Sequence, residues 1–484
     1  MHSSLYIQAR ISKNKSLLFS IAFFLIGLVT GYIIHSEHFF AFLTVFAIFI
    51  YFMIHMKFRI MLLWVAALFP FAFGDLGPIE EFLWVEWMAP LFLISMLYLI
   101  LTEQSYVNYK EKNIFFVALI VFVVVTLINY VKNPVTSHEL FGASTGSSGI
   151  RSYYTIFIGV CLFLIGHWML MNDKLNFNSL FLLLIIISLA AGILRAFSYF
   201  LEFDTPLLFS EFHYAPPPTE YGGSIAHRIG GLDRVTRIGL PAVFAYYYKK
   251  QWNIFAILLV AAFLILMYLG GGRSIFLGVA FAAAVYFMIL HKQRLGFLLL
   301  LIAVLIVAFQ TVSSLIAIPE QFNRIFSYEG GLIQQSLPRG YLFKFYVDSF
   351  LSSPFWGKGI SYIELGLDGE YLNAFVTTNI MIGGHGAYLS IIALFGLGGA
   401  FYLGVFLFGS IFYHLRFLKS TFPEMEKYSD LSLFILLSLL IKTATYVVGG
   451  SGYNDFSLYI FAGLTAGFVT KIQTEKSNRK LDVA

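Results

Sequence analysis

The arginines of this chain gather on one side of the membrane topology that its hydropathy predicts. Lysine-rich loops fall on alternate sides of the apolar stretches, and the lysine-rich side carries fourteen lysines and five arginines. Positive charge on one face is enough to set a topology, whereas a planar guanidinium fork is suited to bind phosphate at two points. We therefore predict a site for a phosphate-bearing ligand on the opposite side. That side has three lysines and seven arginines: Arg151, Arg228, Arg234, Arg237, Arg273, Arg324 and Arg339.

Arg273 combines three features that favour an anion. It follows a run of three glycines and begins an apolar stretch, in the segment GGGRSIFLG. Glycines let the backbone approach a ligand closely, and the helix that follows directs the positive end of its dipole to the same place. The alternative interpretation is an interfacial arginine at a helix start. We predict that Arg273 binds phosphate.

Other arginines of this side lie close to membrane segments. Arg237 stands at a predicted membrane boundary, where a charge is costly without a partner. Arg234 lies one turn before it and Arg228 further upstream, and both also fit ordinary loop charges. Arg339 opens a predicted helix, where the dipole disfavours a cation, so we expect an anionic ligand or an acid such as Glu329 nearby.

His385 is the candidate general base. It lies in the segment IGGHGAYLS, after a glycine pair and immediately before an apolar stretch, at the predicted depth of Arg273. A neutral imidazole beside a water-exposed cleft is suited to remove a proton from a sugar hydroxyl. The alternative is a hydrogen-bonding group at a helix end. The other histidines on this side rank lower; they are His35, His138, His213 and His227.

Membrane helices must position these residues. The chain has 484 residues, of which 59% are hydrophobic and 12% are charged, and its mean hydropathy is +0.81. This composition indicates an all-α, polytopic transmembrane helical bundle, in which about 20 apolar residues form each crossing. Two spans are short, so we expect twelve to fourteen crossings. The predicted spans are 17–34, 38–54, 60–74, 84–101, 114–130, 152–171, 180–201, 237–249, 253–271, 274–291, 295–315, 387–412, 430–449 and 453–470.

Positive charge in the short loops orients the bundle with both chain ends in the cytoplasm. The first apolar run continues into a full span without a signal-peptide cleavage site. The long loops lie on the other side and cover 131–151, 202–236 and 316–386. We expect 1–484 to form a single membrane domain in which 316–386 is the large external loop, and loops of such length usually carry function.

The large loop contains a predicted amphipathic helix. Apolar residues recur at helical spacing between Arg339 and Leu351 (RGYLFKFYVDSFL), and a Gly-rich segment follows. This pattern predicts a helix that lies on the membrane surface. Its apolar face would consist of Leu342, Phe345, Tyr346, Phe350 and Leu351.

Several classes of protein are disfavoured by the sequence. One cysteine, Cys161, gives neither a disulfide nor a Cys-based zinc site within the chain, and no acids stand at metal-ligand spacing near the histidines. The net charge of +5 gives no nucleic-acid signal, and no glycine-rich nucleotide loop is present. Glu86, Arg195 and Lys442 lie within or near spans; we interpret them as structural ion pairs, with a buried charge relay of a transporter as the alternative.

Three segments, taken in order, resemble the bacterial O-antigen ligase and O-antigen polymerase (Wzy-like) superfamily. They are GGGRSIFLG (270–278), RGYLFKFYVDSFLSSPFWGKGIS (339–361) and HGAYLSIIALFGLGG (385–399). The last is similar to the family's histidine, followed by Tyr388, Leu389 and a glycine at Gly396. Two positions depart from the family pattern. Gly386 replaces a common Asn, and Leu394 and Phe395 stand where the family often has Glu.

The resemblance implies a membrane glycosyltransferase without cofactors or a metal. Its donor would be an undecaprenyl-diphosphate-linked oligosaccharide, and the site would face the periplasm of the bacterial inner membrane. Arg273 and Arg339, with Arg237, Arg234 or Arg228, would bind the diphosphate and stabilise its growing charge. His385 would deprotonate the acceptor hydroxyl, which would attack with inversion at the anomeric carbon. Membrane lipid and a chain-length regulator are further candidate partners.

The acceptor separates the alternatives within the family. A polymerase transfers the glycan to another lipid-linked unit, whereas a ligase transfers it to lipid A–core, and some members glycosylate protein. We favour a polymerase, because the loops at 131–151 and 202–236 are long enough to shape two glycan-lipid sites. A lipid-linked glycan transporter or flippase is the alternative of a different class. It predicts inverted repeats and broken helices near mid-membrane, and the sequence indicates neither.

Overall fold

The computed structural model describes residues 113–132, 150–171, 177–200, 232–250, 252–270, 273–290, 344–360, 386–419, 426, 428–448 and 452–483. Every regular element within these residues is helical. The elements are α5 (Ile114–Lys132), α6 (Ile150–Met171), α7 (Phe177–Phe200), α8 (Leu232–Tyr246), α9 (Ile254–Gly270), α10 (Arg273–Leu290), a short helix at 344–352, α16 (Ala387–Leu403), the π-helix η2 (Gly404–Gly409), α17 (Ser410–Lys419), α18 (Ser429–Val448), the short 3-10 turn η4 (Gly452–Asn454) and α19 (Phe456–Val483).

These helices confirm the predicted fold class, a polytopic membrane helical protein. Each predicted span that falls on described residues meets a helix. Within the part of the chain that the structure describes, four helical stretches are long and apolar enough to cross a membrane: Ile114–Lys132, Phe177–Phe197, Ala387–Lys419 and Ser429–Val447. The predicted spans at 17–34, 38–54, 60–74, 84–101 and 295–315 lie outside the described residues.

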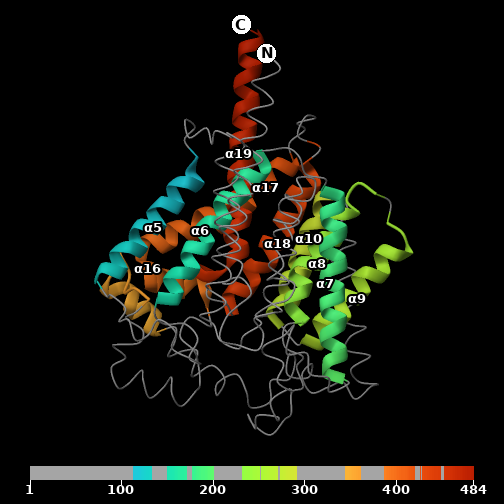
Figure 1. The fold of residues 1–484 in the computed structure, drawn as a ribbon, viewed down its shortest axis with the longest axis horizontal. Coiled ribbons are helices and arrows are strands. Elements are labelled where there is room, and N and C mark those ends of the chain that lie inside the picture. The colour runs from blue at the N-terminus through green and yellow to red at the C-terminus, as the bar shows by residue number, and fades with distance from the viewer. Residues whose placement is uncertain are drawn as a thin grey trace, which may run out of the picture.

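The helices α18 and α19 form the centre of the described bundle (Figure 1). On one side of them lie α5, α6 and α16, and on the other side α7, α8, α9 and α10 (Figure 1). The most extensive contacts pair α6 with α19, α10 with α18 and α7 with α8; α8 also packs on α9 and α18, and α16 on α5. The C-terminal part of α19 extends beyond the other labelled helices, at the top of Figure 1.

Glycines bring α6 and α19 into close contact. A Cβ atom added at Gly463 would overlap the carbonyl oxygen of Phe163, and one added at Gly166 would lie 2.7 Å from the carbonyl oxygen of Ile460. Gly159 in turn lies against the Tyr459 ring. Small residues at such positions let membrane helices approach until their backbones touch.

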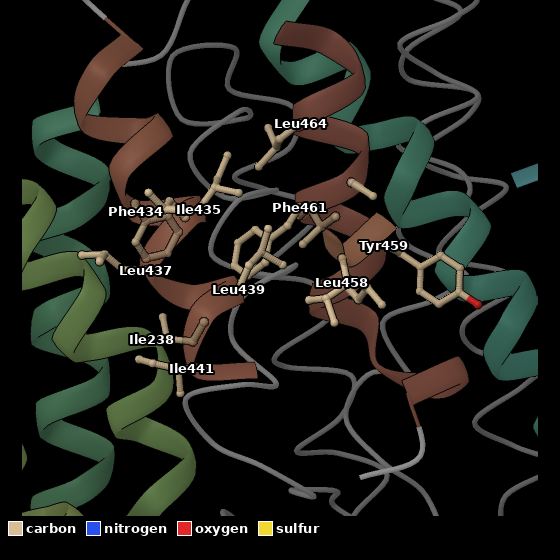
Figure 2. Packing of buried hydrophobic residues seen from close by; sticks show 14 of the residues in the cluster. Ile238, Phe434, Ile435, Leu437, Leu439, Ile441, Leu458, Tyr459, Phe461 and Leu464 are labelled. Atoms are coloured by element: carbon tan, nitrogen blue, oxygen red, sulfur yellow. The ribbon is translucent and has the colours of Figure 1, made fainter. Parts of the chain in front are cut away.

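The core between α18, α19 and α8 is packed with large apolar side chains. Figure 2 shows Ile238 of α8 beside Ile441 of α18. The rings of Phe434 and Phe461 lie between α18 and α19, with centroids 5.8 Å apart (Figure 2). These residues are fully or almost fully buried, which fixes α8 against the centre of the bundle.

Two lysines from loops predicted to be cytoplasmic lie at one end of the bundle. The Lys249 ammonium lies 3.7 Å from the Asp430 carboxylate and donates to the Glu426 carbonyl oxygen at 2.6 Å. The Lys471 ammonium lies 4.8 Å from the centroid of the Tyr428 ring. Both therefore contact the start of α18. This agrees with the side on which the sequence places them, while the orientation of that side in the cell stays a prediction.

The boundaries of α8 differ from the prediction. The predicted span covered 237–249, but the helix begins at Leu232 and ends at Tyr246. Arg234 and Arg237 are consequently residues of the helix and do not precede it. A helix start is marked by polar residues as well as apolar ones, so a hydropathy window places it too late.

The predicted span at 387–412 is not one straight helix. Gly396 has φ 58° and ψ −143°, which breaks α16 within its length. The two arms fold onto each other, because a Cβ atom at Gly399 would lie 2.5 Å from the Ile391 carbonyl oxygen. The Tyr388 ring also stacks on that of Phe408, with centroids 5.9 Å apart. The second arm continues through η2 and α17 to Lys419.

Candidate functional site

A buried charge cluster joins the end of α18 to the start of α19. The Lys442 ammonium lies 2.5 Å from the Asp455 carboxylate, and the Tyr446 hydroxyl donates to the same carboxylate at 2.6 Å. The Asp455 side chain also accepts from the Ser457 hydroxyl at 2.6 Å and from its backbone amide at 3.0 Å. Asp455 therefore caps α19 and neutralises Lys442 at the same time.

Arg237 of α8 belongs to the same region. It lies within electrostatic reach of the Lys442 ammonium and the Tyr446 hydroxyl. The two helices run antiparallel, since Lys249 beyond the end of α8 pairs with Asp430 in the first turn of α18. Arg237 thus lies in the part of the bundle that holds Lys442, and charges within a membrane bundle often mark a functional site.

The first arm of α16 begins beside this cluster. The Tyr388 hydroxyl donates to the Thr443 carbonyl oxygen at 2.9 Å, and its ring lies 5.9 Å from that of Tyr446. Gly452 packs against Ala387, Ile391 and Tyr446, which fixes the helix start from the other side. Since His385 lies two residues before Ala387, the chain enters this region directly after the predicted base.

Gly386 explains one departure from the family pattern. It adopts the left-handed conformation, with φ 68° and ψ 59°, and an added Cβ atom would meet nothing within 4 Å. Glycine and asparagine are the residues that occupy this conformation most readily. Glycine therefore meets the same backbone requirement as the asparagine that is common there, although it provides no side-chain amide.

Arg273 is the first residue of α10, which also packs against α18. Gly278 approaches the backbone of α18 so closely that an added Cβ atom would lie 2.8 Å from the Ile441 carbonyl oxygen. At its other end α10 places the Tyr286 ring 4.7 Å from that of Phe244, near the end of α8. The helix α10 is thus antiparallel to α18, and it begins on the side of α18 that carries Tyr446.

A loop fills the break in α16. The backbone amides of Lys358 and Gly359 donate to the carbonyl oxygens of Ala393 at 3.0 Å and Leu394 at 2.9 Å. In return, the Leu397 amide donates to the Pro354 carbonyl oxygen at 2.8 Å. The segment 353–360 therefore replaces the intrahelical hydrogen bonds that the break removes.

Glycines make this insertion fit. A Cβ atom at Gly396 would lie 2.5 Å from the Pro354 carbonyl oxygen, and one at Gly357 would overlap the Leu394 backbone. Both residues have positive φ, 58° and 73°. Gly357 lies in the second of the three resembling segments and Gly396 in the third, and together they form a backbone junction between these two segments.

The helix before this loop differs from the predicted amphipathic helix. The described part covers 344–352. Phe345 and Tyr346 are buried, whereas Leu351 is 68% exposed, so these residues do not share one face as predicted. Ser349 occupies the buried face instead. The face was predicted from apolar residues alone, and a buried serine does not belong to that pattern. Ser349 can be buried because its side chain is small enough to pack.

The predicted site residues are described to different extents. Arg237 is placed near Lys442, as given above. The backbones of Arg273 and Arg234 lie in the first turns of α10 and α8, but their side chains are outside the description. Arg228, Arg339 and His385 lie outside the described residues altogether.

The predicted structural ion pair of Lys442 is confirmed, and its partner Asp455 was missed by sequence reasoning. A signal was present, because an acid two residues before a serine and an apolar run is typical of a helix cap. Arg195 is buried, and Glu86 lies outside the described residues. No group of three or more His, Cys, Asp or Glu that could hold a metal occurs among the described residues.

Comparison with known proteins gives a family match over the part of the chain that contains the candidate site residues Arg273, Arg339 and His385. Residues 238–404 match the model of a family described as O-antigen ligase (Wzy_C). No curated protein matches the chain. The matched residues include all three segments that carried the resemblance, and they end at the second arm of α16.

Proposed function

Since residues 238–404 match the model of the O-antigen ligase family, we propose that this protein transfers an undecaprenyl-diphosphate-linked oligosaccharide to an acceptor hydroxyl at the periplasmic face. The family consists of membrane enzymes of the ligase or polymerase type that act on lipid-linked glycans in lipopolysaccharide biosynthesis. The matched segment covers Arg273, Arg339 and His385, to which we assign the reaction.

One observation supports this proposal most. The part of α8 that carries Arg237, the first half of α10 and the start of α16 all lie against the second half of α18. The first of these segments carries Arg237, the second begins at Arg273, and the third follows His385 in the chain. Segments that are far apart in sequence thus reach the half of α18 that carries Lys442, and an arrangement of this kind suits a diphosphate site built from several arginines.

In the proposed mechanism the acceptor hydroxyl attacks the anomeric carbon of the donor. His385 takes the hydroxyl proton as the new carbon–oxygen bond forms. The bond between the anomeric carbon and the diphosphate oxygen breaks, and the electron pair leaves with undecaprenyl diphosphate. Arg273, Arg339 and one of the α8 arginines stabilise that growing negative charge. A single displacement inverts the anomeric configuration.

The proposed reaction uses arginines where other transferases use a metal. A guanidinium group can donate two parallel hydrogen bonds to a phosphate and carries a permanent charge. Two or three such groups supply the charge stabilisation that a divalent ion gives in other phosphate chemistry. No nucleotide is consumed, because the anomeric carbon of the donor is already bonded to a good leaving group, the diphosphate.

We propose a polymerase, with the ligase as the alternative. A polymerase binds two glycan lipids, and the long predicted loops at 131–151 and 202–236 offer surface for the second one. A ligase needs only one lipid diphosphate site and a lipid A–core acceptor. The described residues favour neither over the other, so the length distribution of the product decides between the two.

A transporter is the alternative of a different class. A broken helix, which is a feature of transporters and was not predicted from the sequence, is present at Gly396 of α16. However, the break is closed by hydrogen bonds from the segment 353–360. A substrate-binding broken helix of a transporter leaves such backbone groups for the ion or substrate, so we keep glycan transfer as the function.

The proposal is tested with purified protein in detergent or nanodiscs. Lipid-diphosphate oligosaccharide is added alone, with lipid A–core, and with peptide acceptors, and the products are separated by size. A ladder identifies a polymerase, and a single addition to lipid A–core identifies a ligase. Unchanged donor in every mixture, combined with flipping of a fluorescent donor in proteoliposomes, would instead support the transporter.

A further inference from the structure

Asn129 connects three segments that are distant in the sequence. It lies near the end of α5, and none of its surface is exposed. Its Nδ2 atom donates to the Trp356 carbonyl oxygen at 2.9 Å and to the Leu394 carbonyl oxygen at 3.1 Å. Trp356 belongs to the loop that follows the helix 344–352, and Leu394 to the first arm of α16. One amide group thus holds both to α5.

These hydrogen bonds lie at the junction where the loop enters the break of α16. The Leu394 carbonyl oxygen also accepts from the Gly359 amide, so it has donors from two segments. The packing around the junction is tight, because Gly398 of the second arm lies against Val125, one turn before Asn129. A displacement of Asn129 would therefore shift both arms of α16.

We propose that Asn129 is a positioning residue for glycan transfer, which fixes the segment that follows Arg339 against the segment that follows His385. This inference rests on the proposed function, since it assigns those two residues to one reaction. Asn129 does not touch the reacting groups. It acts through the junction, with the helix 344–352 on one side and the helical arm Ala387–Phe395 on the other.

The position of the junction lets it affect where Arg339 and His385 lie. The described part of the helix 344–352 starts five residues after Arg339, and the first arm of α16 begins two residues after His385. Helical segments are stiff, so a shift at the junction moves both of their far ends. Misplacement of reacting groups by about 1 Å costs roughly 100-fold in rate. Losing the two hydrogen bonds at Asn129 is therefore expected to affect catalysis more than stability.

The test separates docking of the loop from catalysis. In a Cys161→Ala background, which removes the sole cysteine, Ile360→Cys places a thiol at a site that is 4% exposed. Asn129→Leu is then added, because leucine keeps the volume and removes both donors. We expect the labelling rate of this thiol by a membrane-impermeant maleimide to rise at least about tenfold. We also expect kcat for glycan transfer to fall about 10- to 100-fold, with a smaller change in KM.

Thr126→Val is the matched control. Thr126 is buried on α5 about one turn from Asn129, but its hydroxyl donates only within the helix, to the Phe122 carbonyl oxygen at 2.8 Å. This variant should leave both the labelling rate and kcat unchanged. Gly396→Ala disturbs the junction without touching α5, because its Cβ atom would lie 2.5 Å from the Pro354 carbonyl oxygen. It should reproduce both effects, and adding Asn129→Leu to it should cause little further loss.

Two results would overturn the inference. One is an Asn129→Leu variant whose thiol at position 360 stays protected, whatever its activity. The other is a variant whose thiol is labelled while glycan transfer continues at the wild-type rate. If the wild-type protein transfers no glycan at all but Asn129→Leu exposes the thiol, the proposed function fails and the docking contact itself stands. Should Asn129→Leu elute as aggregate, the Gly396→Ala variant supplies the same two measurements.

Discussion

Lys442 and Asp455 form an ion pair between two consecutive helices, with 7% and 16% of their side chains exposed. The pair lies where α18 ends and α19 begins, beside the first turn of α16. Taking two charges out of water is costly, and only good geometry with further hydrogen bonds offsets that cost. Tyr446 and Ser457 provide those hydrogen bonds to the carboxylate.

Breaking this pair from one side should destabilise the protein. We expect Lys442→Met to lower stability by about 3–5 kcal/mol, because the buried Asp455 carboxylate loses the ammonium group that lies 2.5 Å from it. The double variant Lys442→Met/Asp455→Asn should regain most of the loss. Reaction of the buried Cys161 with a thiol dye during heating reports the unfolding. A double variant no more stable than Lys442→Met would show that charge balance is not the reason for the pair.

The contact between α6 and α19 should tolerate no side chain at Gly463. Gly463→Val places atoms into the Phe163 backbone, so we expect a loss of roughly 1–3 kcal/mol from overpacking and a lower thermal midpoint. Gly404→Ala is the control, since an added Cβ atom there meets nothing within 4 Å. Equal midpoints for Gly463→Val and wild type would mean that the two helices are not in backbone contact.

Arg273→Lys should impair glycan transfer although the positive charge is kept. A lysine donates from one point and cannot form two parallel hydrogen bonds to a phosphate. The loss of one charge-assisted hydrogen bond corresponds to a fall in kcat/KM of about 10- to 100-fold. The measurement is transfer from a lipid-diphosphate oligosaccharide at several donor concentrations. A fully active lysine variant would refute bidentate phosphate binding at this position.

His385→Ala should lower the transfer rate by about 100- to 10,000-fold, as expected for loss of a general base. Expression and thermal midpoint should stay close to those of the wild type, because the residue precedes α16 and is no part of its first arm. Added imidazole is expected to restore part of the rate. Substantial residual transfer without imidazole would remove His385 as the base.

Chelators should leave the activity intact. Transfer measured in EDTA is expected to equal transfer measured without it, since arginines are proposed to carry the charge stabilisation. The control is EDTA saturated with Mg²⁺ before the assay. Activity that disappears in EDTA and returns with excess Mg²⁺ would contradict the metal-free mechanism.

The helices themselves could be predicted from the sequence, and so could the family whose model residues 238–404 match. A run of about 20 apolar residues can satisfy its backbone in a membrane only as a helix, so α5, α7 and α18 follow from local composition. The motif segments are also local, and the three that resembled the family fall within the matched residues 238–404. The helix starts were less accurate, as α8 demonstrates, because a cap and a first turn are polar.

Only the tertiary structure decided which of these segments meet. Asn129 bonds to residues 227 and 265 positions away, and nothing in its own neighbourhood in the sequence distinguishes it from any other polar residue near a helix end. The break at Gly396 depends on a loop that approaches from outside the helix, and the partner of Lys442 depends on how the chain turns after α18. Hydropathy is a property of each segment alone, whereas hydrogen bonds and ion pairs between segments depend on the packing that places them side by side.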